Sequence, residues 1–271
     1  MASNGTGDGW DLIVSPWHLD EHIPAWAVSA GATALVRPSL PAASQLQRMN
    51  VLYQEAAATV ARARAARPLL LSCDCPAAIG AVAGLQRRYD DVAVVWLDGH
   101  GDFNTPATTI SGYLGGMPLA VLTGRAPELI SEALGLRPVA DDHVVLVDAR
   151  DLDPAERDAL AASQVRCVPA DPAAIRSALG PLGRTPVYLH IDVDVIDSSQ
   201  VPGLRYPAGP GPALARIADC VADVTTSAEV IGACIACTWL PEHINDLTAH
   251  ETITRLGAAL GAKLDEHEDD R

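Results

Sequence analysis

Aromatic and basic side chains are scarce in this chain of 271 residues. Only 4% of the residues are aromatic, and 19 Lys and Arg stand against 34 Asp and Glu, which gives a formal net charge of −15. Nucleic-acid backbones and anionic membranes repel so acidic a protein. We therefore expect neither as a partner. An excess of acids suits cation binding if the acids cluster in a cleft.

Long apolar runs and a secretory leader are also missing. No stretch reaches the roughly 18 consecutive apolar residues that read as a transmembrane helix. The N-terminal MASNGTGDGWD is polar and acidic, whereas a signal peptide is basic and then apolar. The six cysteines follow no spacing of a secreted disulfide framework, and a disulfide between Cys73 and Cys75 is not expected. These absences predict a reduced, cytoplasmic protein without a structural zinc finger.

Short β-rich runs alternate with alanine-rich helical patterns along the chain. The predicted strands are 12–15, 69–72, 93–97, 144–147, 165–168, 187–191 and 231–236, and the predicted helices are 43–66, 77–88, 154–162, 213–224 and 249–264. Several strands are continuously apolar, which is typical of a sheet covered on both faces. The pattern predicts an α/β fold with three layers, α/β/α, around a mostly parallel central sheet. We expect one domain over residues 1–271, with an acidic tail from about residue 264.

Acidic side chains and one imidazole follow two of the predicted strands, at the edge of the sheet where the active sites of open α/β folds lie. They are Asp98, His100 and Asp102 after one strand, and Asp192 and Asp194 after another. Residues two apart in an extended chain lie on one side, so we expect these groups to face a common point. Alternating acids would equally suit a solvated sheet edge. Here, however, they end strands that a two-sided sheet buries.

Carboxylates gathered in a poorly hydrated place repel one another unless cations neutralise them. Four aspartates with one histidine indicate a two-metal site, and their hard oxygen ligands favour Mn²⁺ or Mg²⁺ over a thiolate-type zinc centre. A hydroxide held between two divalent ions is a usable nucleophile at neutral pH. The residues therefore predict a centre of two divalent ions, Mn²⁺ or Mg²⁺.

The motifs DGHGDFNTP, at 98–106, and HIDVDVID, at 190–197, resemble the paired metal signatures of the arginase/agmatinase ureohydrolases. There the first motif usually reads D-A-H-x-D-x-N-T and the second D-x-D, and the likeness runs in order and spacing from about residue 69 to 241. The resemblance implies an arginase-like fold, a homotrimer or homohexamer, and cleavage of a linear amidine C–N bond by a metal-bridging hydroxide. The implied metal ligands are Cys75, Asp98, His100, Asp102, Asp192 and Asp194. Asp98 and Asp192 would bridge the ions, and Asp102 would also be catalytic by accepting a hydrogen bond from the hydroxide.

Cys75, in the stretch SCDCP at 72–76, stands where the family's G-G-D-H-S motif carries its histidine. The resemblance therefore implies a thiolate at or next to the metal, a softer ligand whose pKa metal binding would lower. The alternative is that Cys75 only fills space and that one ion is weakly held.

Two further segments match those that hold a free amino acid in arginases. Asn104, Thr109 and Ser111 match the segment for the α-carboxylate, and Asp153 and Glu156 match the segment for the α-ammonium group. The alternative for the second segment is local, because Asp-Pro starts a helix with Asp153 as its cap. Both sets together favour an α-amino acid over a decarboxylated amine such as agmatine.

The reacting end departs from the family pattern. Gly115 stands where G-N-x-H-G carries the proton-shuttle histidine, and Cys237 or Thr238 stands where a glutamate pairs with the guanidinium, with Glu242 a few residues further on. A buried guanidinium without a carboxylate costs on the order of several kcal/mol, which makes L-arginine a poor substrate. N-hydroxylation lowers the basicity of the guanidine and so removes part of this cost.

The chain also resembles the small branch of the family typified by the N-hydroxy-L-arginine hydrolase of D-cycloserine biosynthesis. That branch shares the cysteine, DGHGDFNTP and the segment GYLGGM. The resemblance implies an N-hydroxyguanidino or guanidino amino acid as substrate and a role in antibiotic biosynthesis. Two alternatives stay open, namely a hydrolase of a non-guanidine amide or imine in specialised metabolism and a non-catalytic metal-binding relative.

Overall fold

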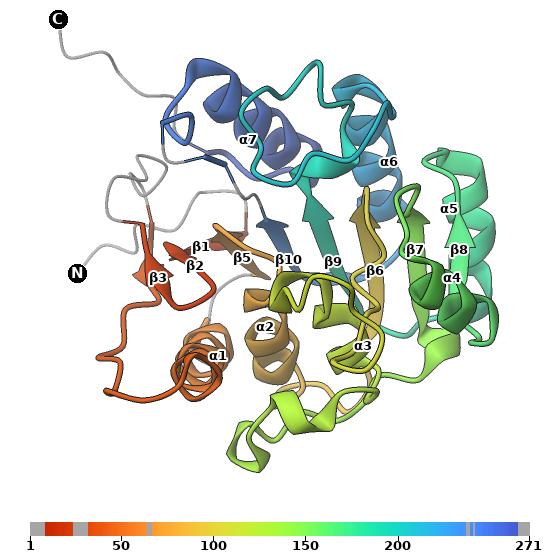
Figure 1. The fold of residues 1–271 in the computed structure, drawn as a ribbon. Coiled ribbons are helices and arrows are strands. Elements are labelled where there is room, and N and C mark those ends of the chain that lie inside the picture. Colours follow the sequence, from red (N-terminus) through yellow and green to blue (C-terminus); the bar gives the residue numbers. More distant parts are fainter. Residues whose placement is uncertain (1–8, 24–31, 64–66, 237–238, 241, 265–271) are drawn as a thin grey trace, which may run out of the picture.

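A parallel sheet of eight strands runs through the middle of the molecule (Figure 1). Its order is β4 (Ala34–Leu35), β1 (Trp10–Ser15), β5 (Arg67–Ser72), β10 (Val230–Ala236), β9 (Val187–Asp192), β6 (Ala93–Asp98), β7 (Val144–Asp148) and β8 (Arg166–Val168). β2 (Trp17–His18) and β3 (Glu21–His22) form a separate antiparallel pair. The computed structural model describes residues 9–23, 32–63, 67–236, 239–240 and 242–264.

Helices cover both faces of the sheet (Figure 1). Packed against one face are α1 (Gln45–Arg62), α2 (Ala77–Leu85), α3 (Pro118–Leu122) and α4 (Pro154–Ala161), and against the other are α5 (Pro172–Leu179), α6 (Leu214–Ser227) and α7 (Leu247–Leu260). Successive strand residues enter opposite cores, because side chains alternate along a strand. In β6, for example, Val95 and Leu97 pack under α5 to α7, whereas Val94 and Trp96 pack under α1 to α4. The predicted three-layer α/β/α fold is thus confirmed.

The predicted strands are all present, with bounds that shift by at most two residues. Two helices, α3 and α5, were not predicted, although Asp171 followed by Pro172 is the usual start of a helix and Asp171 caps α5. The predicted helix 43–66 begins later and ends at Arg62. Its start is set by a capping box, in which Ser44 and Gln47 exchange side-chain-to-backbone hydrogen bonds.

The topology brings the functional motifs to one edge of the sheet. β9 and β6 are neighbours, and β5 lies on the other side of β10, so the carboxyl ends of the three motif-bearing strands lie close together near the middle of the sheet. Across the residues that the structure describes, no helix has the length and apolar character needed to cross a membrane. The predicted acidic tail lies outside the described residues, apart from Leu264.

Candidate metal centre

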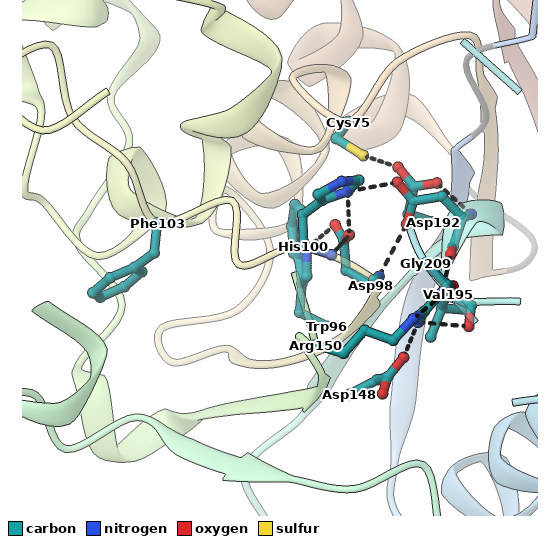
Figure 2. Close-up of polar contacts among 12 residues, drawn as sticks. Cys75, Trp96, Asp98, His100, Phe103, Asp148, Arg150, Asp192, Val195 and Gly209 are labelled. Carbon is teal, nitrogen blue, oxygen red and sulfur yellow. Dashed lines mark hydrogen bonds and ion pairs between the residues drawn. The ribbon is translucent and has the colours of Figure 1, made fainter. Parts of the chain in front are cut away.

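Asp98 and Asp192 are the last residues of β6 and β9, and the side chains around them converge (Figure 2). The Sγ atom of Cys75, which follows β5, lies 2.7 Å from Oδ2 of Asp192. Nδ1 of His100 lies 2.8 Å from Oδ2 of Asp194 and 3.6 Å from Oδ1 of Asp98. These contacts join five of the six predicted ligands in two sets, one of Cys75 and Asp192 and one of His100, Asp98 and Asp194.

The convergence arises from turns and not from the extended chain that alternation predicts. After Asp98 the chain bends back, so that the backbone N–H of His100 donates to Oδ1 of Asp98 at 2.7 Å, and Asp102 has a left-handed backbone with φ of 50°. After Asp192 a short 3-10 turn, Val193–Val195, begins, and Asp192 caps it by accepting from the N–H of Asp194 at 2.8 Å. The expectation of one extended face is wrong, because buried carboxylates at strand ends accept the N–H groups of the next residues.

The donor set fits two divalent ions. Two groups of side chains have ligand atoms within 4.8 Å of one another, one made of Cys75, Asp98 and His190 and the other of Asp98, His100 and Asp194. Asp98 belongs to both groups, as a bridging carboxylate would. Asp102 lines the adjoining cavity, and its Oδ2 atom is buried with no hydrogen-bond partner among the described residues. A buried carboxylate oxygen without a partner, beside such a cluster, lacks the partner that a bound ion or an ion-held hydroxide would supply.

Burial raises the pKa of Asp98, Asp102 and Asp192, and the neighbouring carboxylates raise it further. Burial and the same acids raise the pKa of the Cys75 thiol. Burial lowers the pKa of His100, but hydrogen bonds to Asp194 and Asp98 outweigh it and raise the value to about 12. Without cations this centre therefore retains protons, and metal ions would have to displace them.

His190 is a member of the cluster that the sequence analysis missed. It is fully buried in β9, its Nε2 lies 3.3 Å from Sγ of Cys75, and its ring stacks on Trp96 with the centroids 3.6 Å apart. Burial lowers its pKa to about 3, which keeps the imidazole neutral. Its position, two residues before Asp192 in the same strand, was the signal that could have found it.

A cavity of about 260 Å³ opens beside the cluster. Four of the residues predicted to bind substrate line it, namely Asn104, Ser111, Asp153 and Glu156. Nδ2 of Asn104 donates to Oδ2 of Asp153 at 3.1 Å, so the predicted carboxylate and ammonium sites adjoin. Thr109 does not line the cavity. Its Oγ1 accepts from the N–H of Gly112 at 3.0 Å, because the segment turns outward there.

Both carboxylate oxygens of Glu156 accept hydrogen bonds from backbone N–H groups. Oε1 accepts from the N–H of Phe103 at 2.8 Å and Oε2 accepts from the N–H of Asp153, the first residue outside α4, at 3.3 Å. A Cβ on Gly101 would lie 2.7 Å from Oε1, so this close approach requires glycine. The local alternative, helix-start chemistry, accounts for the contact with Asp153, whereas the contact with Phe103 ties α4 to the segment that follows β6.

Tyr113 fills the place where the proton-shuttle histidine was expected. A Cβ on Gly115 would overlap the ring and hydroxyl of Tyr113. That hydroxyl donates to the carboxylate of Asp74, at 3.2 and 3.3 Å, and lies 3.1 Å from Nε2 of His18, whose Nδ1 meets Arg205 at 3.0 Å. Burial raises the pKa of Asp74 to about 7. None of these side chains was singled out by sequence, because their pairing joins segments far apart in the chain.

The candidates for the missing glutamate do not supply a carboxylate to the described cavity. Cys237 and Thr238 lie outside the described residues, and Glu242 is exposed and does not line the cavity. No disulfide joins Cys73 and Cys75, as expected.

Arg150 fixes the backbone under the centre (Figure 2). Its Nη2 donates to the carbonyl of Asp194 at 3.0 Å, its Nη1 to the carbonyl of Val195 at 3.1 Å, and its Nε to the carbonyl of Gly209 at 3.1 Å. An ion pair with Asp148 holds the guanidinium in turn. The turn that carries Asp194 is therefore rigidly placed.

Known proteins resemble this chain in sequence. Residues 15–250 match the model of the arginase family. N(omega)-hydroxy-L-arginine amidinohydrolase of Streptomyces lavendulae is 36% identical over 149 residues, which are 55% of this chain and 53% of that protein. Arginase of Neurospora crassa is 33% identical over 215 residues, which are 71% of this chain and 58% of that protein. The chain spans about half the length of the curated relatives it matches.

Solved structures resemble it in fold. Arginase from Bacillus cereus has a TM-score of 0.80 at 23% identity, over 94% of this chain and 99% of that one. Proclavaminate amidino hydrolase from Streptomyces clavuligerus has a TM-score of 0.71 at 17% identity, over 96% of this chain and 92% of that one. At these identities the likeness is one of fold, and it agrees with the three layers described above.

Proposed function

This chain belongs to the arginase family, and we propose that it is a two-metal hydrolase that cleaves a C–N bond of an N-hydroxyguanidino amino acid such as N-hydroxy-L-arginine. The observation that carries the proposal is the pair of ligand groups that share Asp98 beside a cavity of about 260 Å³. Cys75, Asp98, Asp102, His100, Asp192 and Asp194 would hold the ions, for which we propose Mn²⁺. When bound, the ions supply a nucleophilic hydroxide at neutral pH and polarise the carbon under attack.

The outer part of the cavity suits a free α-amino acid. Among the described residues that line it, acids abound and no lysine or arginine is present. An α-ammonium group would pair with Asp151 or Asp153, and the α-carboxylate would accept hydrogen bonds from Asn104 and Ser111. The 3.1 Å contact between Asn104 and Asp153 supports this, because the two charged ends of one amino acid must bind side by side.

The reacting end suits a guanidine of low basicity. Besides the proposed metal ligands, Asp74 supplies a carboxylate to this part of the cavity. Its oxygens already accept hydrogen bonds from the hydroxyl of Tyr113 and from the N–H groups of Leu19 and Cys75. Apart from the proposed metal ligands, a cationic guanidinium would therefore find no free carboxylate partner here, whereas a neutral N-hydroxyguanidine needs none. Asp102 would take the proton of the nucleophile on its free Oδ2 and pass it to the leaving nitrogen.

Tyr113 would carry protons in place of the absent histidine, through its hydroxyl and the adjoining His18. We expect Tyr113→Phe to lower kcat about 100-fold with little change in KM or bound metal, because the ring still covers Gly115 and only the hydroxyl is lost. Tyr206→Phe is the matched control, since that ring also lines the cavity, 4.6 Å from Tyr113, and we expect its kcat to stay near the wild-type value. A wild-type kcat in the Tyr113 variant would show that another group moves the proton.

The direct test of the function measures products from the manganese-loaded protein. We expect hydroxyurea from N-hydroxy-L-arginine, with kcat/KM about 100-fold above that for urea release from L-arginine, and no product from agmatine. Metal content is measured on the same sample. Two bound ions with neither product would overturn this function in favour of a hydrolase of a non-guanidine amide or imine, and a chain that binds no ions would indicate a non-catalytic relative.

A further inference from the structure

The two halves of the centre differ in the softness of their ligands. The outer half, made of Asp98, His100 and Asp194, offers carboxylate oxygens and one imidazole, whereas the buried half offers a thiol, an imidazole and the shared carboxylate of Asp98. The family pattern has a histidine at position 75, and here it is a cysteine. An imidazole is nevertheless present in the buried half, on a different strand, as His190.

The separation of the two atoms suits a shared ion. Ligand atoms at bond lengths of about 2.3 Å for sulfur and about 2.1 Å for nitrogen lie about 3.1–3.6 Å apart when the bonds make an angle of about 90–110°. Nε2 of His190 lies 3.3 Å from Sγ of Cys75. A hydrogen bond between the two atoms would give a similar separation. The surroundings of the imidazole ring therefore have to distinguish a hydrogen bond from a shared ion.

Those surroundings point to a ligand. A hydrogen-bonded thiol and imidazole need no third group, yet a carboxylate oxygen of Asp98 lies within 4.8 Å of both atoms, and Oδ2 of Asp192 lies 2.7 Å from the sulfur. Three donors thus lie around one point, and Asp192 adjoins the sulfur. In the part of the chain that the structure describes, Cys75 is the one hydrogen-bond partner of His190, because Nδ1 has none. A fully buried imidazole with so little to bind costs stability unless it serves another purpose.

The neighbouring tryptophan orients the ring for that purpose. Trp96 stacks on His190 at an interplanar angle of 14°, and its Nε1 donates to Oδ2 of Asp98 at 2.9 Å. One indole therefore positions both the imidazole and the carboxylate that the two halves share. Fixed ligands of this kind are what a metal site needs from its supporting residues.

We propose that His190 binds the buried ion and supplies the nitrogen ligand that position 75 lacks. With sulfur and nitrogen together, the buried half binds divalent ions of the zinc or cobalt class more tightly than the outer half does, so these ions report on it, while Mn²⁺ stays the ion proposed for both halves of the working enzyme. The proposal rests on the two-metal centre proposed above. It adds one ligand and a difference in metal affinity between the two halves.

His190→Phe tests the ligand, because phenylalanine keeps a ring against Trp96 and removes the nitrogen. We expect the affinity for the first zinc ion, measured by competition with a chromophoric chelator, to fall more than 100-fold, beyond the 10–100-fold typical of a residue that only supports a ligand. In the cobalt-loaded protein the thiolate charge-transfer band should remain while the ligand-field bands change. Zinc affinity within threefold of wild type and an unchanged cobalt spectrum would overturn the proposal.

Two further measurements guard against a folding defect in that variant. Cys75→His combined with His190→Phe returns the imidazole to the motif position, and we expect it to recover zinc affinity to within tenfold of wild type; no recovery in a folded double variant would count against the proposal. X-ray absorption of the wild-type protein with one equivalent of zinc should show one sulfur and at least one imidazole nitrogen, and a sulfur–oxygen shell alone would overturn it. If the wild-type protein hydrolyses N-hydroxy-L-arginine but its zinc has no imidazole ligand, only this inference is wrong. If its zinc has the imidazole ligand but no hydrolysis occurs, only the proposed function is wrong.

Discussion

Removal of the divalent ions should lower the melting temperature by about 10–20 °C at pH 8. Ions bound at 100 times their dissociation constant contribute about 2.7 kcal/mol each, so two contribute about 5 kcal/mol. A domain of this size shifts by about 2–4 °C per kcal/mol. When bound, the ions would neutralise Asp98, Asp102 and Asp192, whose carboxylates are buried together.

The pH dependence of the metal-free protein should run opposite to that of the loaded one. Since the pKa values of Asp98, Asp102 and Asp192 are raised, the folded state holds protons that the unfolded state has lost. Their contribution to stability is complete below the ordinary carboxyl pKa of about 4 and is lost as the pH rises through the raised values. His100 acts in the same direction, because its pKa of about 12 lies above its ordinary value.

Calorimetry of EDTA-treated and manganese-reloaded protein between pH 5.5 and pH 8 checks both statements. The gap between the two melting temperatures should widen as the pH rises. Asp142→Asn, which removes an exposed acid far from the centre in the chain, should leave the gap unchanged. Equal melting temperatures with and without chelator at pH 8 would mean that the buried acids are not neutralised by metal.

Asp102→Asn should lower kcat about 1,000-fold, within the range for loss of a general acid–base group. Oδ2 of Asp102 is buried beside the cavity without a partner, and an amide there can neither take nor pass on a proton. The backbone should be unaffected, because asparagine tolerates the left-handed conformation that Asp102 adopts, with φ of 50°.

The assay is kcat with N-hydroxy-L-arginine, measured together with metal content, so that loss of an ion is distinguished from loss of the proton acceptor. Asp151→Asn is the control, because Asp151 lines the same cavity but is exposed at its rim. We expect that change to raise KM and to leave kcat within about threefold. A kcat within tenfold of wild type for the Asp102 variant with both ions bound would remove this residue from the chemistry.

Much of the centre could be predicted because parallel strands end at one edge. Asp98 and Asp192 close strands of continuous apolar residues, and such strands lie in the interior of a covered sheet. The path of the chain beyond the strand ends was not predictable. Thr109 turns away from the cavity, and Asp102 reaches it through a left-handed bend, because hydrogen bonds among nearby residues decide these conformations.

The contacts that distinguish this pocket from its relatives were missed for a related reason. His190 meets Cys75 across 115 positions of sequence, and Tyr113 meets Asp74 across 39. Periodicity within one strand or one motif carries no information on which residue of another segment lies opposite. A histidine inside an apolar strand is therefore interpreted as a packed core residue until the residues opposite it on other strands are known.

The position of the Tyr113 ring over Gly115 also restricts how this pocket can change. A Cβ at position 115 would overlap the ring, so Gly115→His would have to displace Tyr113 from its place beside Asp74 and His18. The imidazole and the phenol hydroxyl would then compete for one space. Conversion between the two kinds of pocket, in evolution or by design, therefore exchanges one group for the other and cannot simply add the imidazole.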